Sequence, residues 1–407
     1  MVNRVVLAPI GSTGDVMPLA LIGVALREVG WDVSACATRD FRSLFEQRGI
    51  RFQAIDVDAR DLSAGLDGGI AAVLRGARRL RPVAQIALDA LDEAFRDVDL
   101  VVGSALQLFA PAFCSARGIP YVYASSAPTN ERGAQLPPHF VPIHGAGRVG
   151  NAALWAAQNA VFDRLFRAIA TDAYERAGRA RPPKRLLETI SSTPLVLGLY
   201  DRAIVGPEHR GAAPLGACFI EDDVVPLDAD FEAFLAAGPP PVYITFGSMT
   251  ARDPHARTAL VLDAVEKAGV RAVLDKGWGG MAERMGHAER VHWVSGVNYH
   301  RLLPRLAAIV HHGGAGTIAM SARAGLPQVI VPHITDQFYF GRRIAALHAG
   351  PKPLPVKRLS GARLAKRIVR AVNDPAIRAG AGALAGQIGG ADGPQAAARA
   401  LTAYVSR

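Results

Sequence analysis

Short apolar runs alternate with segments of helical spacing along this chain, and the alternation occurs in two series. The first series has its apolar runs at residues 4–9, 32–37, 52–55, 99–103 and 121–124. The second has them at residues 242–246, 270–274, 291–294, 307–310 and 328–331. Short strands separated by helices are typical of βαβ units built on a parallel sheet. The pattern therefore predicts an α/β protein with two Rossmann-like domains.

A stretch of different composition lies between the two series. Residues 206–240 are rich in Pro, Gly and acidic residues, which is typical of a connecting segment. We therefore expect an N-terminal domain over residues 1–205, an interdomain linker at 206–240 and a C-terminal domain over 241–385. A final helical segment, 386–407, follows. The length of 407 residues agrees with two domains, since single domains usually have about 50–250 residues.

The chain carries a net charge of +10, but its basic residues are spread over the sequence. The densest groups, 75–81 and 176–185, contain few aromatic residues, and neither zinc-finger spacing nor an RNA-binding signature is present. We therefore expect an arginine-rich solvated surface and no nucleic-acid partner. No apolar run is long enough for a transmembrane segment, although the basic surface permits peripheral contact with an anionic membrane.

The three cysteines, Cys36, Cys114 and Cys218, are far apart and odd in number. This pattern excludes a disulfide framework, shows no metal-ligand spacing and fits a reducing cytoplasm. Acidic triplets of the DxD type lie at residues 56–58, 97–99 and 228–230. Such triplets are expected by chance in a chain with 36 acidic residues, so we interpret them as surface residues. The sequence therefore predicts a cytoplasmic protein with no metal and no cofactor.

The sequence IVHHGGAGTIAM, residues 309–320, places three glycines and two histidines between an apolar run and a helical segment. Glycines allow a backbone to approach a ligand closely, and the start of a helix presents N–H groups and a positive dipole end to an anion. Thr317 adds a hydroxyl donor, and a histidine before the turn can donate to a phosphate oxygen. A tight turn without a ligand would explain the glycines, but not the histidines together with Thr317. Neither a Walker A motif nor a G-x-G-x-x-G after the first strand is present, which disfavours NTPase and dehydrogenase functions.

The segment HHGGAGTIAMSARAGLPQVIVPHITDQFYF, residues 311–340, closely resembles the donor-binding signature of inverting glycosyltransferases of the two-domain GT-B fold. The similarity is greatest to bacterial natural-product enzymes such as the vancomycin-group glycosyltransferases, and to the rhamnolipid and sterol glycosyltransferases. Residues 11–38 resemble the N-terminal signature of the same family, and three further motifs follow in the expected order: TFGSM (245–249), GWGG (277–280) and LLPRLAAIVHHGGAGT (302–317). The resemblance implies two Rossmann-like domains that face each other across a cleft, with C-terminal helices that pack back on the N-terminal domain.

The resemblance also implies roles for individual residues. Those assigned to the donor diphosphate are Gly247, Ser248, His312, Gly314, Gly316 and Thr317. Those assigned to the nucleoside are Trp278, Val294 and Val297, and those assigned to the sugar hydroxyls are Asp336 and Gln337. The chemistry agrees, because side-chain acceptors suit sugar hydroxyls and N–H or O–H donors suit anionic oxygens. His311 has no assigned role and is expected to be structural.

Asp15 lies in the glycine-rich segment after the first predicted strand. In the resembled families this position holds an Asp or His that deprotonates the acceptor hydroxyl, and general-base help is needed when that oxygen attacks the anomeric carbon. An aspartate before an apolar helix is also a preferred N-cap, so a structural role is the alternative. We expect Asp15 to be the catalytic base. The candidate acceptor-binding residues are Ser12, Thr13, His139 and His144, although a lone loop histidine is more often simply solvated.

Two positions depart from the resembled pattern. Met320 stands where the plant branch of the family has a glutamate that binds ribose hydroxyls, and Asn298–Tyr299 replaces the more usual proline-containing turn. The ribose contact must therefore come from elsewhere, and the sequence leaves the nucleobase and the sugar open.

Together these features predict an inverting, metal-independent glycosyltransferase. It would move a hexose or deoxyhexose from a UDP- or TDP-sugar to a hydroxyl group of a lipophilic natural product, sterol or lipid, as a monomer or homodimer. One alternative is a sugar-nucleotide epimerase of the same architecture, and another is a non-catalytic partner that binds a sugar nucleotide. Long irregular segments after N-terminal strands, 56–79 and 125–150, favour an acceptor pocket over the epimerase. Asp15 and the intact turn at 311–317 argue against a non-catalytic partner.

Overall fold

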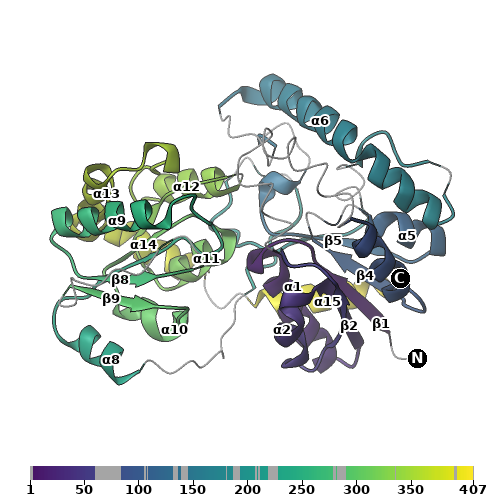
Figure 1. Cartoon of the computed structure of the whole chain (residues 1–407), viewed down its shortest axis with the longest axis horizontal. Coiled ribbons are helices and arrows are strands. Elements are labelled where there is room, and N and C mark those ends of the chain that lie inside the picture. Colours follow the sequence, from purple (N-terminus) through teal and green to yellow (C-terminus); the bar gives the residue numbers. More distant parts are fainter. Residues whose placement is uncertain are drawn as a thin grey trace. The chain divides into compact units, whose positions relative to one another are not determined.

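The computed structural model describes residues 3–59, 84–104, 107, 109–131, 136–138, 145–179, 181–186, 193–206, 209, 211–218, 228–277, 281, 290–334, 336–388 and 392–406. The chain divides into two compact units (Figure 1). The first unit comprises residues 1–219 together with 391–407, and the second comprises residues 220–390. Each unit is built on its own parallel sheet, so the predicted α/β class with two Rossmann-like halves is confirmed.

The sheet of the first unit has the strand order β3-β2-β1-β4-β5-β6. Its strands are β1 (Arg4–Ala8), β2 (Asp32–Thr38), β3 (Arg51–Ile55), β4 (Leu100–Gly103), β5 (Tyr121–Ser125) and β6 (Val196–Gly198). All pairings are parallel; on β1, Val6 lies opposite Ser34 of β2 and Val101 of β4. The order reverses between β1 and β4, and ligands of open α/β sheets bind beyond the carboxyl ends of strands at such a switch point.

Successive residues of β1 point to opposite faces of this sheet, and helices pack against both. Besides a helix at residues 84–94, the helices in the described part of this unit are α1 (Thr13–Glu28), α2 (Arg42–Glu46), α5 (Ala110–Arg117), α6 (Gly147–Arg176) and α15 (Gly393–Val405), with 3-10 turns at Arg39–Phe41 and Pro128–Asn130. On one face, Val6 joins a core cluster with Phe162 and Ile169 of α6. On the other, a Cβ atom at Gly23 of α1 would lie 2.7 Å from Cδ1 of Leu7, so glycine permits the close contact of α1 with β1.

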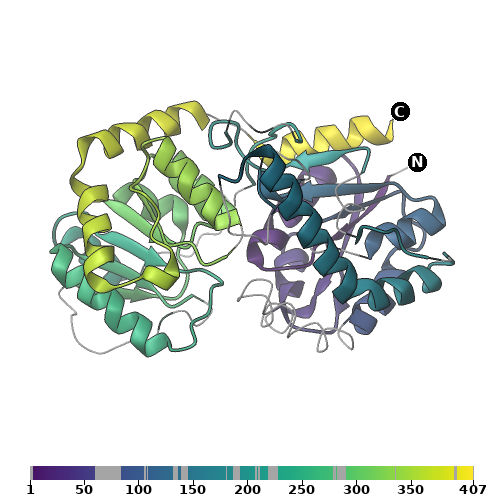
Figure 2. The same ribbon diagram turned by 90° about the horizontal axis from the view of Figure 1, so that it is seen from above.

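The last helix, α15, follows the second unit in sequence but packs on α1 of the first unit. Its Gln395 donates a hydrogen bond of 2.5 Å to Glu28 of α1. Figure 2 shows α15, in yellow, alongside the sheet of the first unit. The preceding helix, α14 (Pro375–Ile388), packs on α11 (Ala315–Arg323) of the second unit. The expected return of the chain to the N-terminal domain is thus confirmed for α15.

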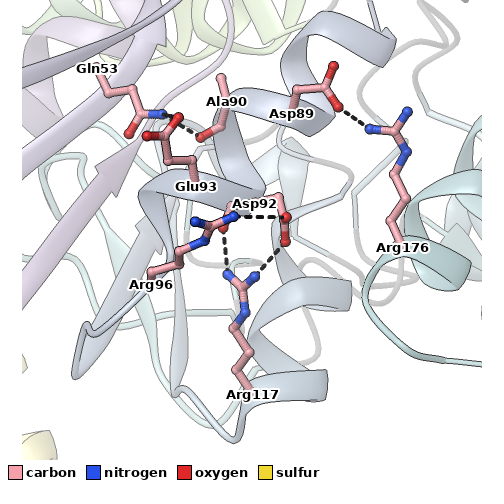
Figure 3. A network of polar contacts seen from close by, with 8 residues as sticks. All are labelled: Gln53, Asp89, Ala90, Asp92, Glu93, Arg96, Arg117 and Arg176. Carbon is pink, nitrogen blue, oxygen red and sulfur yellow. Dashed lines mark hydrogen bonds and ion pairs between the residues drawn. The ribbon is translucent and has the colours of Figure 1, made fainter.

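Residues 84–94 form a helix that polar contacts tie to α5 and α6 (Figure 3). Arg117 of α5 donates to the carboxylate of Asp92 at 2.5 Å and to its carbonyl oxygen at 2.8 Å. Arg176 of α6 pairs with Asp89. Partly exposed ion pairs contribute at most about 1 kcal/mol each. The buried face of this helix, which lies in the core cluster beside α6, therefore supplies more of its stability than the ion pairs do.

The sheet of the second unit has the strand order β11-β10-β7-β8-β9. Its strands are β7 (Val242–Thr245), β8 (Ala272–Asp275), β9 (Val291–Val294), β10 (Ala308–His311) and β11 (Gln328–Ile330). The order reverses between β7 and β10, where His311 lies opposite Thr245. The turns that follow these two strands, TFGSM and HHGGAGT, therefore lie at the switch point of the second sheet.

Apolar side chains alternate between the two faces of this sheet. The helices of the unit, besides α11 and α14, are α8 (Ala229–Ala236), α9 (Pro254–Ala268), α10 (Tyr299–Leu302), α12 (Asp336–Ala346) and α13 (Gly361–Asn373), with 3-10 turns at Leu303–Arg305 and Val356–Arg358. Val242 and Ile244 pack with α9 and α13 on one face. Tyr243 packs on the other, with Phe231 of α8 and Leu302 of α10.

The predicted linker, 206–240, includes α8. Asp228 caps this helix by accepting a hydrogen bond of 2.7 Å from the backbone N–H of Phe231. Phe231 and Leu235 are buried in the core of the second unit, and residues 219–227 lie outside the described part of the chain.

Candidate functional site

The turns that follow β7 and β8 are in direct backbone contact. Gly247 and Gly277 both have a φ of 55°, in the left-handed region that favours glycine. A Cβ atom at Gly277 would lie 2.6 Å from the carbonyl oxygen of Gly247. Gly247 of the TFGSM motif and Gly277, the first residue of the GWGG motif, are therefore required for this close approach. Ser248 lies half-buried in the first of these turns.

His312 lies between two of the predicted diphosphate-binding glycines. A Cβ atom added to Gly247 would lie 2.8 Å from Cε1 of His312, and one added to Gly314 would lie 2.5 Å from Nε2 of His312. The side chain is 8% exposed, and burial lowers its pKa from 6.5 to about 4, so the ring is neutral near pH 7. Its Nδ1 atom is buried and has no hydrogen-bond partner among the described residues. A neutral imidazole carries one N–H donor, which is what a contact with a phosphate oxygen requires.

His311 has a different environment from its neighbour. It is fully buried, its Nδ1 accepts a hydrogen bond of 3.2 Å from the N–H of Gly313, and its Nε2 lies 3.1 Å from Oε1 of Gln328. Nε2 therefore carries the proton and donates to the glutamine. Burial lowers the pKa of His311 to about 3. Both ring nitrogens are used within the fold, so His311 holds the turn to β11.

The start of α11 leaves backbone N–H groups without partners from the helix itself. Gly314 is the N-cap and supplies no side chain, and the first turn contains no acidic residue. The first hydrogen bond runs from the N–H of Ile318 to the carbonyl of Gly314 at 2.9 Å. A Cβ atom at Gly316 would have no neighbour within 4 Å. Open space beside uncapped N–H groups and a positive dipole end suits an anion.

Asp275, which the sequence analysis missed, connects strand β7 with the turns after β8 and β9. It ends β8, is 8% exposed, and accepts from the hydroxyl of Tyr243 at 2.7 Å. Its other oxygen accepts from the N–H of Gly277 at 3.0 Å and from the N–H of Gly296 at 3.3 Å. An acidic residue that ends a buried apolar strand directly before a glycine turn was the available signal in the sequence.

The two predicted sugar-binding residues begin α12. Gln337 is 4% exposed, and its Oε1 accepts from the N–H groups of His333 at 2.8 Å and Ile334 at 3.2 Å. Its carbonyl therefore caps the turn before α12. Asp336 is half-buried, and its charge acts to raise the pKa of His312 against the larger effect of burial.

The residues predicted for the nucleoside are distributed differently. Val294 and Val297 are partly buried and pack against the core cluster that contains Tyr243. Met320, the position of departure from the resembled pattern, packs against the same cluster. Trp278 lies outside the described residues.

In the first unit, Asp15 is the third residue of α1, and Ser12 is its N-cap. The carboxylate oxygen Oδ2 accepts from the backbone N–H of Ser12 at 2.9 Å and from its hydroxyl at 3.2 Å. The alternative interpretation of Asp15 as the N-cap is therefore wrong in position, because Asp15 closes a capping box from the N3 position. Thr13 begins the helix and is half-buried. His139 and His144 lie outside the described residues.

Ser104, directly after β4, fixes the turn that carries Asp15. Its hydroxyl accepts from the N–H of Ile10 at 2.9 Å and lies 3.0 Å from the carbonyl oxygen of the same residue. A Cβ atom at Gly11 would lie 2.3 Å from Oδ2 of Asp15. The carboxylate is thus held against the backbone at the switch point of the first sheet.

Neither a metal cluster nor a membrane-spanning helix is found among the described residues. They contain no group of three or more His, Cys, Asp or Glu side chains placed to hold a metal ion. None of their helices is both long and apolar enough to cross a membrane.

Comparisons with known proteins match both halves of the chain. Residues 5–125 match the glycosyltransferase family 28 N-terminal domain, and residues 277–404 match the C-terminal domain of proteins like erythromycin biosynthesis protein CIII. The vancomycin aglycone glucosyltransferase of Amycolatopsis orientalis is 32% identical over 99% of this chain and 98% of its own length. A sterol 3-beta-glucosyltransferase of Arabidopsis thaliana is 28% identical over 98% of this chain and 67% of its own length.

Among solved structures, the glycosyltransferase VinC in complex with DTDP shares the fold. The TM-score is 0.68 at 20% sequence identity, and the match covers 99% of this chain and 100% of that chain.

Proposed function

We propose that this chain, which belongs to the GT-B glycosyltransferases that include the vancomycin aglycone glucosyltransferase, transfers a hexose or deoxyhexose from a UDP- or TDP-sugar to a hydroxyl group of a lipophilic acceptor. Family membership establishes the chain as a glycosyltransferase. The donor, the acceptor and the stereochemistry are the parts that we propose.

The observation that carries the donor proposal is the open start of α11 beside His312. Backbone N–H groups without helical partners, the clearance at Gly316 and a neutral histidine together provide donors and space for a diphosphate. The turns at Gly247 and Gly314 bring their backbones against the His312 ring. The solved VinC was crystallised with DTDP, which supports a nucleoside diphosphate as the ligand class.

The proposed reaction is a single displacement that inverts the anomeric carbon. The acceptor oxygen forms a bond to that carbon while the bond from carbon to the diphosphate oxygen breaks, and Asp15 takes the proton of the acceptor hydroxyl. Negative charge then builds up on the departing diphosphate. The N–H groups at the start of α11 are already oriented toward that charge, so they stabilise it without a metal ion.

The proposed acceptor class follows from the names of two relatives. One is named for an antibiotic aglycone and another for sterols, so a natural product, sterol or lipid is the expected class. The free, buried cysteines Cys36, Cys114 and Cys218 support a cytoplasmic location, where thiols stay reduced.

A thermal-shift screen with UDP-, TDP- and GDP-sugars tests the donor class. A ligand present at about 100 times its Kd adds about 2.7 kcal/mol of stability, which raises the Tm by several degrees. We expect UDP- or TDP-sugars to raise the Tm and GDP-sugars to leave it unchanged. The stabilising sugar is then incubated with a panel of aglycones, and the anomeric configuration of the product is read by NMR. A Tm that no nucleotide sugar changes, or a product with retained configuration, would contradict the proposal.

A further inference from the structure

One buried carboxylate, that of Asp275, accepts hydrogen bonds on both of its oxygens. Its Oδ1 accepts from the backbone N–H of Gly277 at 3.0 Å and from that of Gly296 at 3.3 Å. Its Oδ2 accepts from the hydroxyl of Tyr243 at 2.7 Å and, over a longer distance of 3.4 Å, from the hydroxyl of Thr245. A carboxylate only accepts, so each of these four groups uses its proton for the contact.

Thr245 extends this set of contacts to a further turn. The backbone N–H of Gly247 donates to Oγ1 of Thr245 at 3.1 Å, which leaves the hydroxyl proton of the threonine for Asp275. Thr245 ends β7 and is 1% exposed, so both contacts are shielded from water. Asp275 is therefore linked directly to the turns after β8 and β9 and, through Thr245, to the turn after β7.

The glycines in these three turns share a backbone conformation. Their φ angles are 55° at Gly247, 55° at Gly277 and 80° at Gly296, all in the left-handed region that favours glycine. The N–H of each is directed into the fold, toward Asp275 or Thr245. While these bonds hold, the three N–H groups are not donors for an anion, so the turns contribute their shape to the site.

The segments held in this way are those that the sequence predicts for the donor. Gly247 begins the pair predicted to lie beside the diphosphate, and Gly277 begins the GWGG motif. Gly296 lies between Val294 and Val297, which are predicted for the nucleoside. One carboxylate thus joins segments predicted for the two ends of a nucleoside diphosphate.

We propose that Asp275 is a positioning residue, which holds the turns after β7, β8 and β9 in the arrangement that binds the nucleoside diphosphate, with Thr245 as its link to the first turn. This inference rests on the proposed function, since it concerns how the same site binds the donor. Asp275 acts through the turns and does not itself touch the ligand.

Two neutral substitutions separate this role from a purely structural one. Thr245→Val and Tyr243→Phe each remove a hydroxyl that donates to Oδ2 of Asp275, and both leave the carboxylate in place. Only the hydroxyl of Thr245 also accepts from a glycine turn, whereas that of Tyr243 makes the shorter contact from within β7. We expect Thr245→Val to weaken binding of UDP or TDP about three- to tenfold, and Tyr243→Phe to weaken it less while lowering the free energy of unfolding more.

Calorimetric titration and urea unfolding measure the two quantities, and Thr245→Ser, which keeps the hydroxyl, should bind nucleotide nearly as well as the wild type. If the contacts were only structural, affinity would follow stability and Tyr243→Phe would be the more affected variant in both. That result would overturn the inference, as would unchanged or tighter nucleotide binding by Thr245→Val.

A double-mutant cycle in nucleotide affinity tests Asp275 itself. Asp275→Asn removes a charge as well as an acceptor, so the informative quantity is the effect of Thr245→Val in that background. We expect it to weaken binding less there than in the wild type, because the link between the two residues is already impaired. Strict additivity would show that Thr245 acts without Asp275 and would contradict the inference alone. Failure of the wild type to bind UDP or TDP would contradict the proposed function and this inference together.

Discussion

The turn after β1 and the turn after β10 have the same construction, since each joins a buried strand to a helix through glycines at the switch point of its sheet. They differ in what occupies the start of the helix. At α1, the carboxylate of Asp15 lies in the first turn and accepts from the N–H of Ser12. At α11, the cap is Gly314 and the first turn has no acid. The first helix thus has an anion from its own chain, whereas the second has none among the described residues. This difference supports our proposal of a base at the first turn and an anion site at the second.

Removing the charge from the first turn has the largest expected effect. Asp15→Asn keeps an oxygen that can accept from Ser12 but cannot take a proton, so we expect kcat to fall by about 10²- to 10⁴-fold while nucleotide binding stays unchanged. Asp253→Asn is the matched control, because Asp253 caps α9 by accepting from the N–H of Ala256 and has no proposed chemical role. Turnover assays and nucleotide titrations measure the two quantities. Near-normal turnover by Asp15→Asn would mean that Asp15 only caps the helix.

We expect the two histidines of the second turn to have different roles, His312 in nucleotide binding and His311 in stability. His312→Ala removes a donor to a charged ligand, so we expect nucleotide binding to weaken by about ten- to a hundredfold with a smaller loss of stability. His311→Ala leaves the N–H of Gly313 and the side chain of Gln328 without their partner, so we expect its main effect to be on the free energy of unfolding. Calorimetric titration and urea unfolding of both variants separate these effects. Equal losses of nucleotide affinity in the two variants would contradict the assignment of binding to His312 and of stability to His311.

Acid is expected to destabilise the protein through the buried histidines around the second turn. The pKa values of His311, His312 and His333 are lowered by burial to about 3, 4 and 3. The unfolded chain takes up protons at these residues below about pH 6.5, whereas the folded chain does so only near its lowered pKa values. Their stabilising contribution is therefore complete above that pH and is lost as the pH falls toward 4 and then 3, by on the order of 1 kcal/mol per ring between pH 6.5 and 5.

Urea unfolding at pH 7, 6 and 5 measures this effect. We expect His311→Gln to reduce the difference in unfolding free energy between pH 7 and pH 5, and replacement of the exposed His300 serves as the control. A pH dependence that His311→Gln leaves unchanged would show that this ring does not contribute in this range.

The sequence predicted the fold and part of the site for physical reasons that the structure makes visible. Parallel strands and the turns at their carboxyl ends follow from local periodicity, so the turns that contain Gly247, Gly314 and His312 could be anticipated, whereas the roles of these residues came from the family resemblance. The spacing of Ser12 and Asp15 is that of a capping box, and it could have placed Asp15 at N3 instead of at the N-cap.

Other features depend on contacts between segments far apart in the chain. Asp275 binds groups from the turns after β8 and β9 and from β7, and no local pattern shows that these meet. Oε1 of Gln337 accepts from the backbone of the turn before α12, and only the folded geometry shows this contact; the predicted contact of Gln337 with sugar hydroxyls stays a prediction. Tyr299 was identified in the sequence only as a departure from a family pattern, and its edge-to-face contact with the ring of Tyr243 is evident only in the structure.

The central claim is that the start of α11 binds the donor diphosphate because, unlike α1, it has no anion of its own. Gly316→Asp gives this helix a carboxylate in its first turn, and Gly316→Asn is the neutral control of the same shape; both side chains have room, since a Cβ atom there meets nothing within 4 Å. Calorimetric titration with UDP and TDP should show that the Asn variant binds nucleotide with nearly wild-type affinity. The Asp variant should bind at least about 100-fold more weakly, because like charges placed together cost several kcal/mol. Without ligand, the Asp variant should be at least as stable as the Asn variant, since an acid favours a helix N-terminus. Equal nucleotide affinity of the two variants would contradict the claim that the diphosphate binds at α11.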